Sequence, residues 1–381
     1  MKFFDLKKSF GIGILTMLLW ACGGGSTDEK DPDPVDEGKD RKAILTNIAD
    51  NIILPSYAAF KVKFDVMATI SDAFVAKPDL TTLTELRTAY TQAYLEWQKV
   101  ELFEFGPGEK YTIRNFFNIY PANVAGITGD FADPNSNLDT PDSYARQGFP
   151  ALDYLLFGVG ATDQAVVAFY TAPAEGAKRT ASVKRLVGRM STLLGKVMTE
   201  WQGSYKDTFI NKTGLDIGSS TSLMINAYVL HYERYIRSGK FGIPSGAMLN
   251  GVPAADKVEA YYQKNISLDL AKNAHQAAID FFNGKSSKSG EEGPSFKTYL
   301  NALGAKDSST GKLLSEIINT QFAASKLKLE SLSPNLSDEV KNNNQKMKDV
   351  YNEMQKAVRM LKVDMTSAMS ITITYTDNDG D

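Results

Sequence analysis

Residues 183–201 read VKRLVGRMSTLLGKVMTEW, and the apolar side chains of this stretch recur every three or four positions. The apolar positions are Val183, Leu186, Val187, Met190, Leu194, Val197 and Trp201. This spacing places them along one face of an α-helix, because a helix turns once every ~3.6 residues. The pattern therefore predicts an amphipathic helix that buries one face against other helices.

The same periodicity continues on both sides of this stretch. One stripe runs from Leu83 to Val100 and opens with Thr82-x-x-Glu85, a capping-box pattern. Another runs from Met347 to Met365. Strand-like alternation is confined to Ser370–Tyr375, so we predict an all-α fold. Further helices are predicted near residues 55–76, 142–156, 219–238, 254–283 and 312–330.

The first residues are typical of a bacterial lipoprotein signal. Lysines precede an apolar run from Phe10 to Ala21, which is too short to span a membrane. The run ends in Leu-Trp-Ala-Cys at residues 19–22, which resembles a lipobox and contains the only cysteine of the chain. We predict cleavage before Cys22, lipidation of Cys22, and anchoring in the bacterial envelope, at the outer membrane.

Breaks in the helical pattern predict four parts of the chain. Residues 23–40 read GGGSTDEKDPDPVDEGKD, which is too polar to bury a core and suits a flexible acidic tether. A long Gly-, Pro- and Asp-containing stretch at residues 104–141 is typical of a functional loop. The predicted parts are a signal peptide at 1–21, a tether at 22–40, an N-terminal helical-bundle domain at 41–172 and a C-terminal helical-bundle domain at 173–381.

Composition excludes several classes of function. The chain has 381 residues, a formal net charge of −3, one cysteine and two histidines. The acidic balance argues against nucleic-acid binding. His231 and His275 are too far apart in the sequence for a zinc helix of the HExxH type, and neither a nucleophile elbow nor a phosphate-binding loop occurs.

Several separated segments carry a family resemblance. Residues 146–158 read RQGFPALDYLLFG, and they occur together with LPSY at 54–57, WQKVE at 97–101 and GKFGIP at 239–244. In these segments the chain resembles the imelysin-like family, also classified as peptidase M75. The resemblance implies a secreted or lipid-anchored protein of two helical bundles with a site at the domain interface. It also implies a link to iron uptake and, in some members, metallopeptidase activity.

The family signature GxHxxE maps onto Gly148-Phe-Pro-Ala-Leu-Asp153. A histidine and a carboxylate three positions apart lie on one helix face and can bind one metal ion. Here Pro150 supplies no donor, whereas Asp153 keeps the carboxylate. A site built only from oxygen atoms favours a hard divalent ion such as Ca²⁺ or Mg²⁺ over zinc or iron. We therefore expect a binding protein without peptidase activity and without a catalytic residue.

Asp153 has two interpretations at this stage. It is a candidate ligand for a divalent metal, or it is a helix-start or interface residue that pairs with a neighbour such as Arg146. The aromatic and charged residues nearby in the family-like segments complete the candidate ligand-binding set at the domain interface. This set is Tyr57, Trp97, Glu101, Arg114, Arg146, Pro150 and Asp153.

Three functions remain open from the sequence. The first is a lipid-anchored binding component of iron or other metal acquisition, with a metal, an iron carrier or an envelope protein as partner. The second is a metallopeptidase that recruits a displaced histidine such as His231. The third is a surface scaffold that binds a partner through the 104–141 loop.

Overall fold

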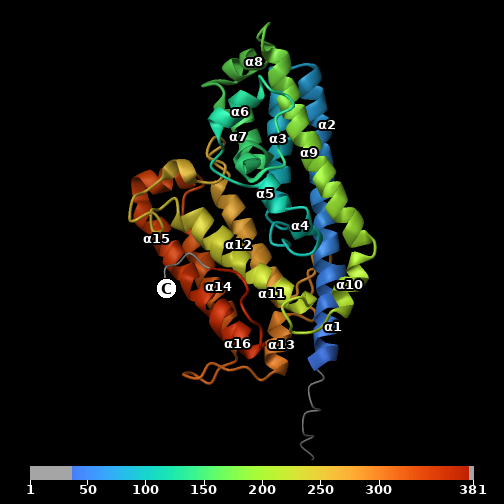
Figure 1. The fold of residues 1–381 in the computed structure, drawn as a ribbon. Helices are drawn as coiled ribbons and strands as arrows, with labels where there is room; N and C mark the ends of the chain where they lie inside the picture. The colour runs from blue at the N-terminus through green and yellow to red at the C-terminus, as the bar shows by residue number, and fades with distance from the viewer. Residues whose placement is uncertain (1–36, 377–381) are drawn as a thin grey trace, which may run out of the picture. The chain divides into compact units, whose positions relative to one another are not determined.

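The computed structural model describes residues 37–376, and these residues belong to one compact unit. They form helices without any β-strand, which confirms the all-α prediction (Figure 1). The predicted signal peptide, Cys22, most of the tether and residues 377–381 lie outside the described residues. The first helix, α1 (Glu37–Asn47), begins within the stretch that we predicted as tether.

α1 continues through a π-helical turn at Ile48–Ile53 into α2 (Leu54–Ala76). Pro55 explains this widened turn, because proline lacks the N–H group and its ring collides with the preceding helical turn. α2 packs against α3 (Leu80–Trp97) and α9 (Gly176–Gln202). α3 begins with a capping box between Asp79 and Thr82, so our choice of Thr82 as the capping residue was wrong by one turn.

Several short helices connect or follow these three long helices along the chain. They are α4 (Pro107–Lys110), α5 (Ile113–Phe117), α6 (Val124–Asp130), α7 (Gly148–Asp153), α8 (Asp163–Thr171) and α10 (Tyr205–Asn211). α4, α5 and α6 lie within the predicted 104–141 loop. The 172/173 boundary remains a prediction, and the helix that follows it, α9, packs along α2, α7 and α8.

The remaining helices form a second packed group. α11 (Ser220–Leu230) continues into a π-helical segment, η4 (His231–Gly242), which packs against α12 (Ser267–Asn283) and α15 (Leu336–Arg359). α13 (Phe296–Ala302) and α14 (Leu314–Glu330) complete the group, and a second π-helical turn at Met360–Met365 leads into α16 (Thr366–Ala368). Figure 1 shows this group beside the α2–α3–α9 group.

Residues 258–266 form an irregular segment, so the helix predicted over 254–283 begins only at Ser267. Ala260 and Lys264 both have positive φ angles, of 55° and 69°, and such angles interrupt a helix. The segment with strand-like alternation, Ser370–Tyr375, forms no strand; it runs in extended form along α11, where Thr374 N–H donates to Asn226 at 2.8 Å.

Among residues 37–376, no single helix has both the length and the apolar character needed to cross a membrane. Only the bent pair of residues 141–158 and 163–171, with an angle of 105° between its halves, reaches that length and composition.

Candidate functional site

A small cavity lies at the position of the family motif. Its volume is about 160 Å³, and Pro150 and Asp153 of α7 form one wall. The opposite wall belongs to the irregular 258–266 segment, and the remaining wall comes from Tyr120–Ala122. The lining residues are Tyr120, Pro121, Ala122, Pro150, Asp153, Asp256, Val258, Ala260, Tyr261 and Tyr262.

The start of α7 depends on a glycine. Gly148 has a φ angle of +75°, and a Cβ atom there would lie 2.3 Å from the carbonyl oxygen of Phe117. No other residue fits this close approach without moving α5. Pro150 follows in the first turn of α7, where its missing N–H group leaves no helical hydrogen bond unmade. Glycine and proline together therefore fix α7 and turn Asp153 toward the 258–266 segment.

Asp153 holds the irregular segment in place. Its carboxylate oxygens accept hydrogen bonds from the backbone N–H groups of Tyr262 at 2.8 Å and Gln263 at 2.9 Å. The side chain is only 2% exposed. Burial raises the pKa of Asp153 to about 7, although the two N–H groups act in the opposite direction. Asp153 is thus an anchor for the cavity wall as well as part of its lining.

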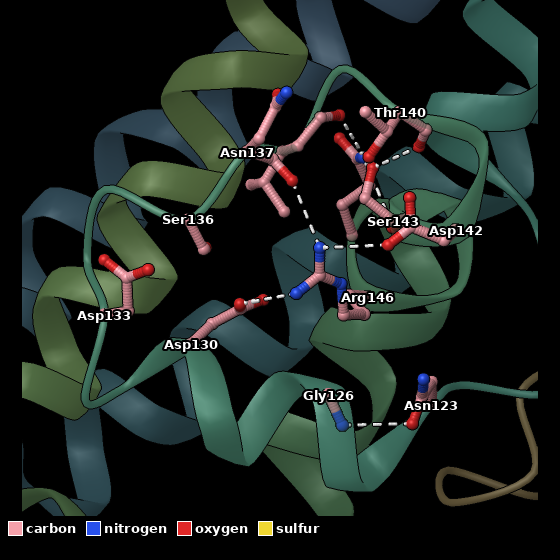
Figure 2. A network of polar contacts seen from close by, with 12 residues as sticks. Asn123, Gly126, Asp130, Asp133, Ser136, Asn137, Thr140, Asp142, Ser143 and Arg146 are labelled. Carbon is pink, nitrogen blue, oxygen red and sulfur yellow. Dashed lines mark hydrogen bonds and ion pairs between the residues drawn. The ribbon is translucent and has the colours of Figure 1, made fainter.

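Arg146 does not line this cavity. Figure 2 shows its guanidinium between Asp130, at 2.8 Å, and the carbonyl oxygen of Asn137, at 3.1 Å. Asp142 lies 3.9 Å from the same group. Arg146 therefore stabilises the 131–145 loop, and the pairing with Asp153 that we considered from the sequence was wrong.

A buried ionic network lies next to the cavity. Lys240 of η4 forms an ion pair with Glu259, and both side chains are 2% exposed. Gln98, at the end of α3, accepts from Lys240 at 2.8 Å and donates to Glu259 at 3.0 Å. The network therefore connects α3 with η4 and with the segment that forms the cavity wall.

Glu101 belongs to the same network. Asn118 donates hydrogen bonds to Glu101 at 2.8 Å and to Glu259 at 2.7 Å. Burial raises the pKa of Glu101, and the charge of Lys240 opposes this rise. The sequence prediction that Glu101 belongs to a polar site is consistent with these contacts.

Arg114 and His231 carry buried polar atoms without hydrogen-bond partners in the described part of the chain. These are Nε and Nη1 of Arg114 and both ring nitrogens of His231. The Arg114 guanidinium lies 3.6 Å from the ring centre of Tyr235. Burial lowers the pKa of His231 well below its usual value, and the charges of Arg114 and Lys240 add to this effect. His231 is therefore a neutral imidazole in a positive field.

Two further predicted residues lie in the core. Trp97 is fully buried and stacks on Phe117 with ring centres 4.8 Å apart. Tyr57 is 1% exposed and packs on Phe103. Neither residue lines the cavity. An apolar stripe gives no signal that distinguishes a core aromatic residue from one facing a cleft.

The structure adds residues that the sequence analysis missed. Lys240 was within the family-like GKFGIP segment but carried no predicted role, and Glu259 was assigned to a helix. Gln98 and Asn118 are uncharged, so no pattern of charges marked them. Tyr120, Tyr261 and Tyr262 bring phenol groups to the cavity, and an aromatic-rich stretch at 111–121 was the available signal for Tyr120.

The donor set does not fit a transition-metal ion. No group of three or more histidine, cysteine, aspartate or glutamate side chains within residues 37–376 is arranged to hold a metal. Pro150 offers no donor beside Asp153, and the two oxygens of Asp153 already accept backbone hydrogen bonds. His231 does not line the cavity, and the charges of Arg114 and Lys240 that help to lower its pKa also oppose a metal ion at its ring.

The fold and this site define a class: an all-helical protein with a small cavity at the Gly148–Asp153 turn. The family model for imelysin, peptidase family M75, matches residues 53–364, and the chain belongs to the imelysin family. Two solved structures share its fold. One is described as a candidate iron-regulated protein A precursor from Parabacteroides distasonis; its TM-score is 0.69 at 17% identity, covering 89% of this chain and 97% of that chain.

The other solved structure is an imelysin-like protein from Psychrobacter arcticum. Its TM-score is 0.65 at 16% identity, covering 89% of this chain and 98% of that chain. A curated relative, iron-regulated protein A of Synechococcus elongatus, is 24% identical over 121 residues. That match covers 30% of this chain and 33% of the relative, so the chain spans about a third of the relative's length.

Proposed function

We propose that this protein is an exported, lipid-anchored binding component of iron acquisition that does not cleave peptides. Membership of the imelysin family and similarity to proteins named for iron regulation support the iron link. The lipobox-like sequence ending at Cys22 supports the anchor. The motif cavity carries the non-proteolytic part of the proposal. There Pro150 has no donor atom for a metal, and Asp153 already accepts two backbone hydrogen bonds.

Hydrolysis by a metallopeptidase needs an open metal position that activates water. Three protein donors typically hold such a metal, and the motif turn here supplies only the Asp153 carboxylate. If a cation enters the cavity, its donors are the carboxylates of Asp153 and Asp256 and the phenols of the lining tyrosines. This oxygen-only set favours a hard ion such as Ca²⁺ or Mg²⁺.

The alternative of a displaced histidine receives no support from the position of His231. Its imidazole does not line the motif cavity, and Arg114 and Lys240 act on it with positive charge. A divalent ion bound there would add charge to a buried positive field. We therefore assign the buried network a role in holding the two helix groups together around the ligand cavity.

Gene deletion in the source bacterium tests this function. We expect the deletion strain to take up less ⁵⁵Fe than its parent under iron limitation, and the wild-type gene to restore uptake. Cys22→Ala should restore less uptake, because the protein is no longer anchored. Equal uptake by the deletion strain and its parent would contradict the role in iron acquisition.

A further inference from the structure

α9 is strongly basic although the chain as a whole is acidic. Between Gly176 and Gln202 its only acidic residue is Glu200. The basic residues are Lys178, Arg179, Lys184, Arg185, Arg189 and Lys196. Lys178 pairs with Glu175 and Lys184 with Asp72, so the positive charge of this helix is only partly neutralised.

The 131–140 loop lies along α9 and leaves two neighbouring hollows. One has a volume of about 640 Å³ and is lined largely by apolar residues, including Phe131 and Ala181. The other has a volume of about 560 Å³ and contains Arg189 and Lys196. Arg185 lines both hollows, so they adjoin at its side chain, and together they are called the groove below. Its lining also includes two carboxylates, Asp130 paired with Arg146 and Asp139 paired with Arg189.

Two cations of this groove have no carboxylate partner within residues 37–376. Arg185 donates to the hydroxyl of Ser136 at 3.0 Å and to the carbonyl oxygen of the same residue. Lys196 lies 5.8 Å from the ring centre of Tyr111. Arg189, by contrast, is neutralised by an ion pair with Asp139 at 2.5 Å. The positive charge of Arg185 and Lys196 is therefore available to an acidic ligand.

The length of the groove favours an extended chain over a compact small molecule. From Ala177 to Lys196 the helix rises ~28 Å, at ~1.5 Å per residue. An extended peptide of about eight residues covers the same distance. The surface of α9 is also open near the middle of the groove, because a Cβ atom added to Gly188 would have no heavy atom within 4 Å.

We propose that this groove binds an acidic, extended segment of a partner protein. An apolar side chain of that segment packs beside Phe131 and Ala181, and its carboxylates pair with Arg185 and Lys196. The groove lies on α9 and the 131–140 loop, away from the residues that line the motif cavity. The proposal therefore does not depend on the role in iron acquisition.

Fluorescence anisotropy with the purified full chain tests the proposal. The probe is a fluorescein-labelled ten-residue peptide of glutamate residues around one central phenylalanine; the matched peptide has glutamine in place of each glutamate. We expect the acidic peptide to bind at least tenfold more tightly than the matched peptide, and its binding to weaken as salt rises.

Variants of the groove cations show where on the protein the peptide binds. Arg185→Gln with Lys196→Gln should weaken binding of the acidic peptide at least tenfold, whereas Arg185→Lys should keep most of it. The matched control is Lys328→Gln, which changes an exposed lysine of α14 and should leave binding unchanged. Far-ultraviolet circular dichroism shows whether each variant stays folded.

Equal binding of the acidic and glutamine peptides would overturn the proposal. The same conclusion follows if Lys328→Gln weakens binding as much as the Arg185 and Lys196 changes do. Displacement of the peptide by an equal concentration of citrate would show a site for small anions and would also overturn it.

Discussion

At the scale of single residues, Asp153 connects the family motif to the rest of the molecule. Its carboxylate occupies the position of the motif glutamate, but its oxygens bind the backbone of Tyr262 and Gln263. The residue shapes the cavity wall by holding the irregular segment against α7. Any ligand in the cavity therefore contacts a wall whose position depends on this one side chain.

Substitution of Asp153 should change how stability depends on pH. Burial raises the folded-state pKa to about 7, above the usual value of an aspartate, so between about pH 4 and pH 7 the folded chain holds a proton that the unfolded chain releases. The contribution of Asp153 to stability therefore falls as pH rises through this window. Relative to Asp153→Asn, the wild type should lose up to ~1.4 kcal/mol per pH unit there.

Urea unfolding at several pH values measures this difference. Asp207→Asn, an exposed carboxylate on α10, is the matched control, and its difference from the wild type should stay constant across the window. A constant difference for Asp153→Asn as well would show that the buried carboxyl does not titrate as described.

The structure brings some of the candidate site residues together and places others elsewhere, for physical reasons. Pro150 and Asp153 line the cavity, and Glu101 belongs to the buried network, as their charge or motif position indicated. Trp97 lies in the aromatic core. The sequence did not reveal this, because an aromatic residue on an apolar stripe has the same spacing whether it is buried or faces a cleft. Arg146 binds the carboxylate of Asp130, and no local pattern selects that partner over Asp153.

At the scale of elements, the Lys240–Glu259 pair joins a π-helical segment to an irregular one. Both charges are almost fully buried, so each depends on the other for compensation. Gln98 binds both partners and ties them to the end of α3. This pair therefore stabilises the arrangement of η4 around the cavity.

Removing one charge of this pair should be strongly destabilising. Lys240→Met leaves Glu259 buried without a counter-charge, and we expect a loss of ~3–5 kcal/mol in the free energy of unfolding. Adding Glu259→Leu should recover more than half of that loss. Denaturant titration of both variants measures the effect.

An exposed pair supplies the control. Lys61→Met breaks the surface pair with Asp65 on α2, and its effect should stay below ~1 kcal/mol. If Lys240→Met were as mild as Lys61→Met, the network would not hold η4 and the irregular segment together.

Long helices such as α2, α9, α14 and α15 followed from apolar periodicity, whereas short helices such as α4, α5 and α6 did not. The irregular 258–266 segment could not be predicted in this way. Its positive φ angles at Ala260 and Lys264 are held by tertiary contacts, above all the hydrogen bonds to Asp153, which lies far away in the sequence. The sequence analysis therefore assigned the residues of the cavity wall to a helix.

At the scale of the whole molecule, two groups of helices meet at the polar network and the motif cavity. The family assignment and the all-α fold agree with the sequence analysis. At position 150 this chain has proline, where the motif that the resemblance implies has histidine. We propose that this difference removes transition-metal binding and hydrolysis while the cavity remains as a recognition site.

Isothermal titration of zinc into the wild type and Pro150→His tests this claim most directly. A histidine at 150 would stand one helical turn from Asp153 and restore a nitrogen donor. We predict no wild-type binding tighter than ~0.1 mM, and at least tenfold tighter binding by Pro150→His, or ~1.4 kcal/mol. Submicromolar zinc binding by the wild type, with cleavage of casein that a chelator abolishes, would contradict the account.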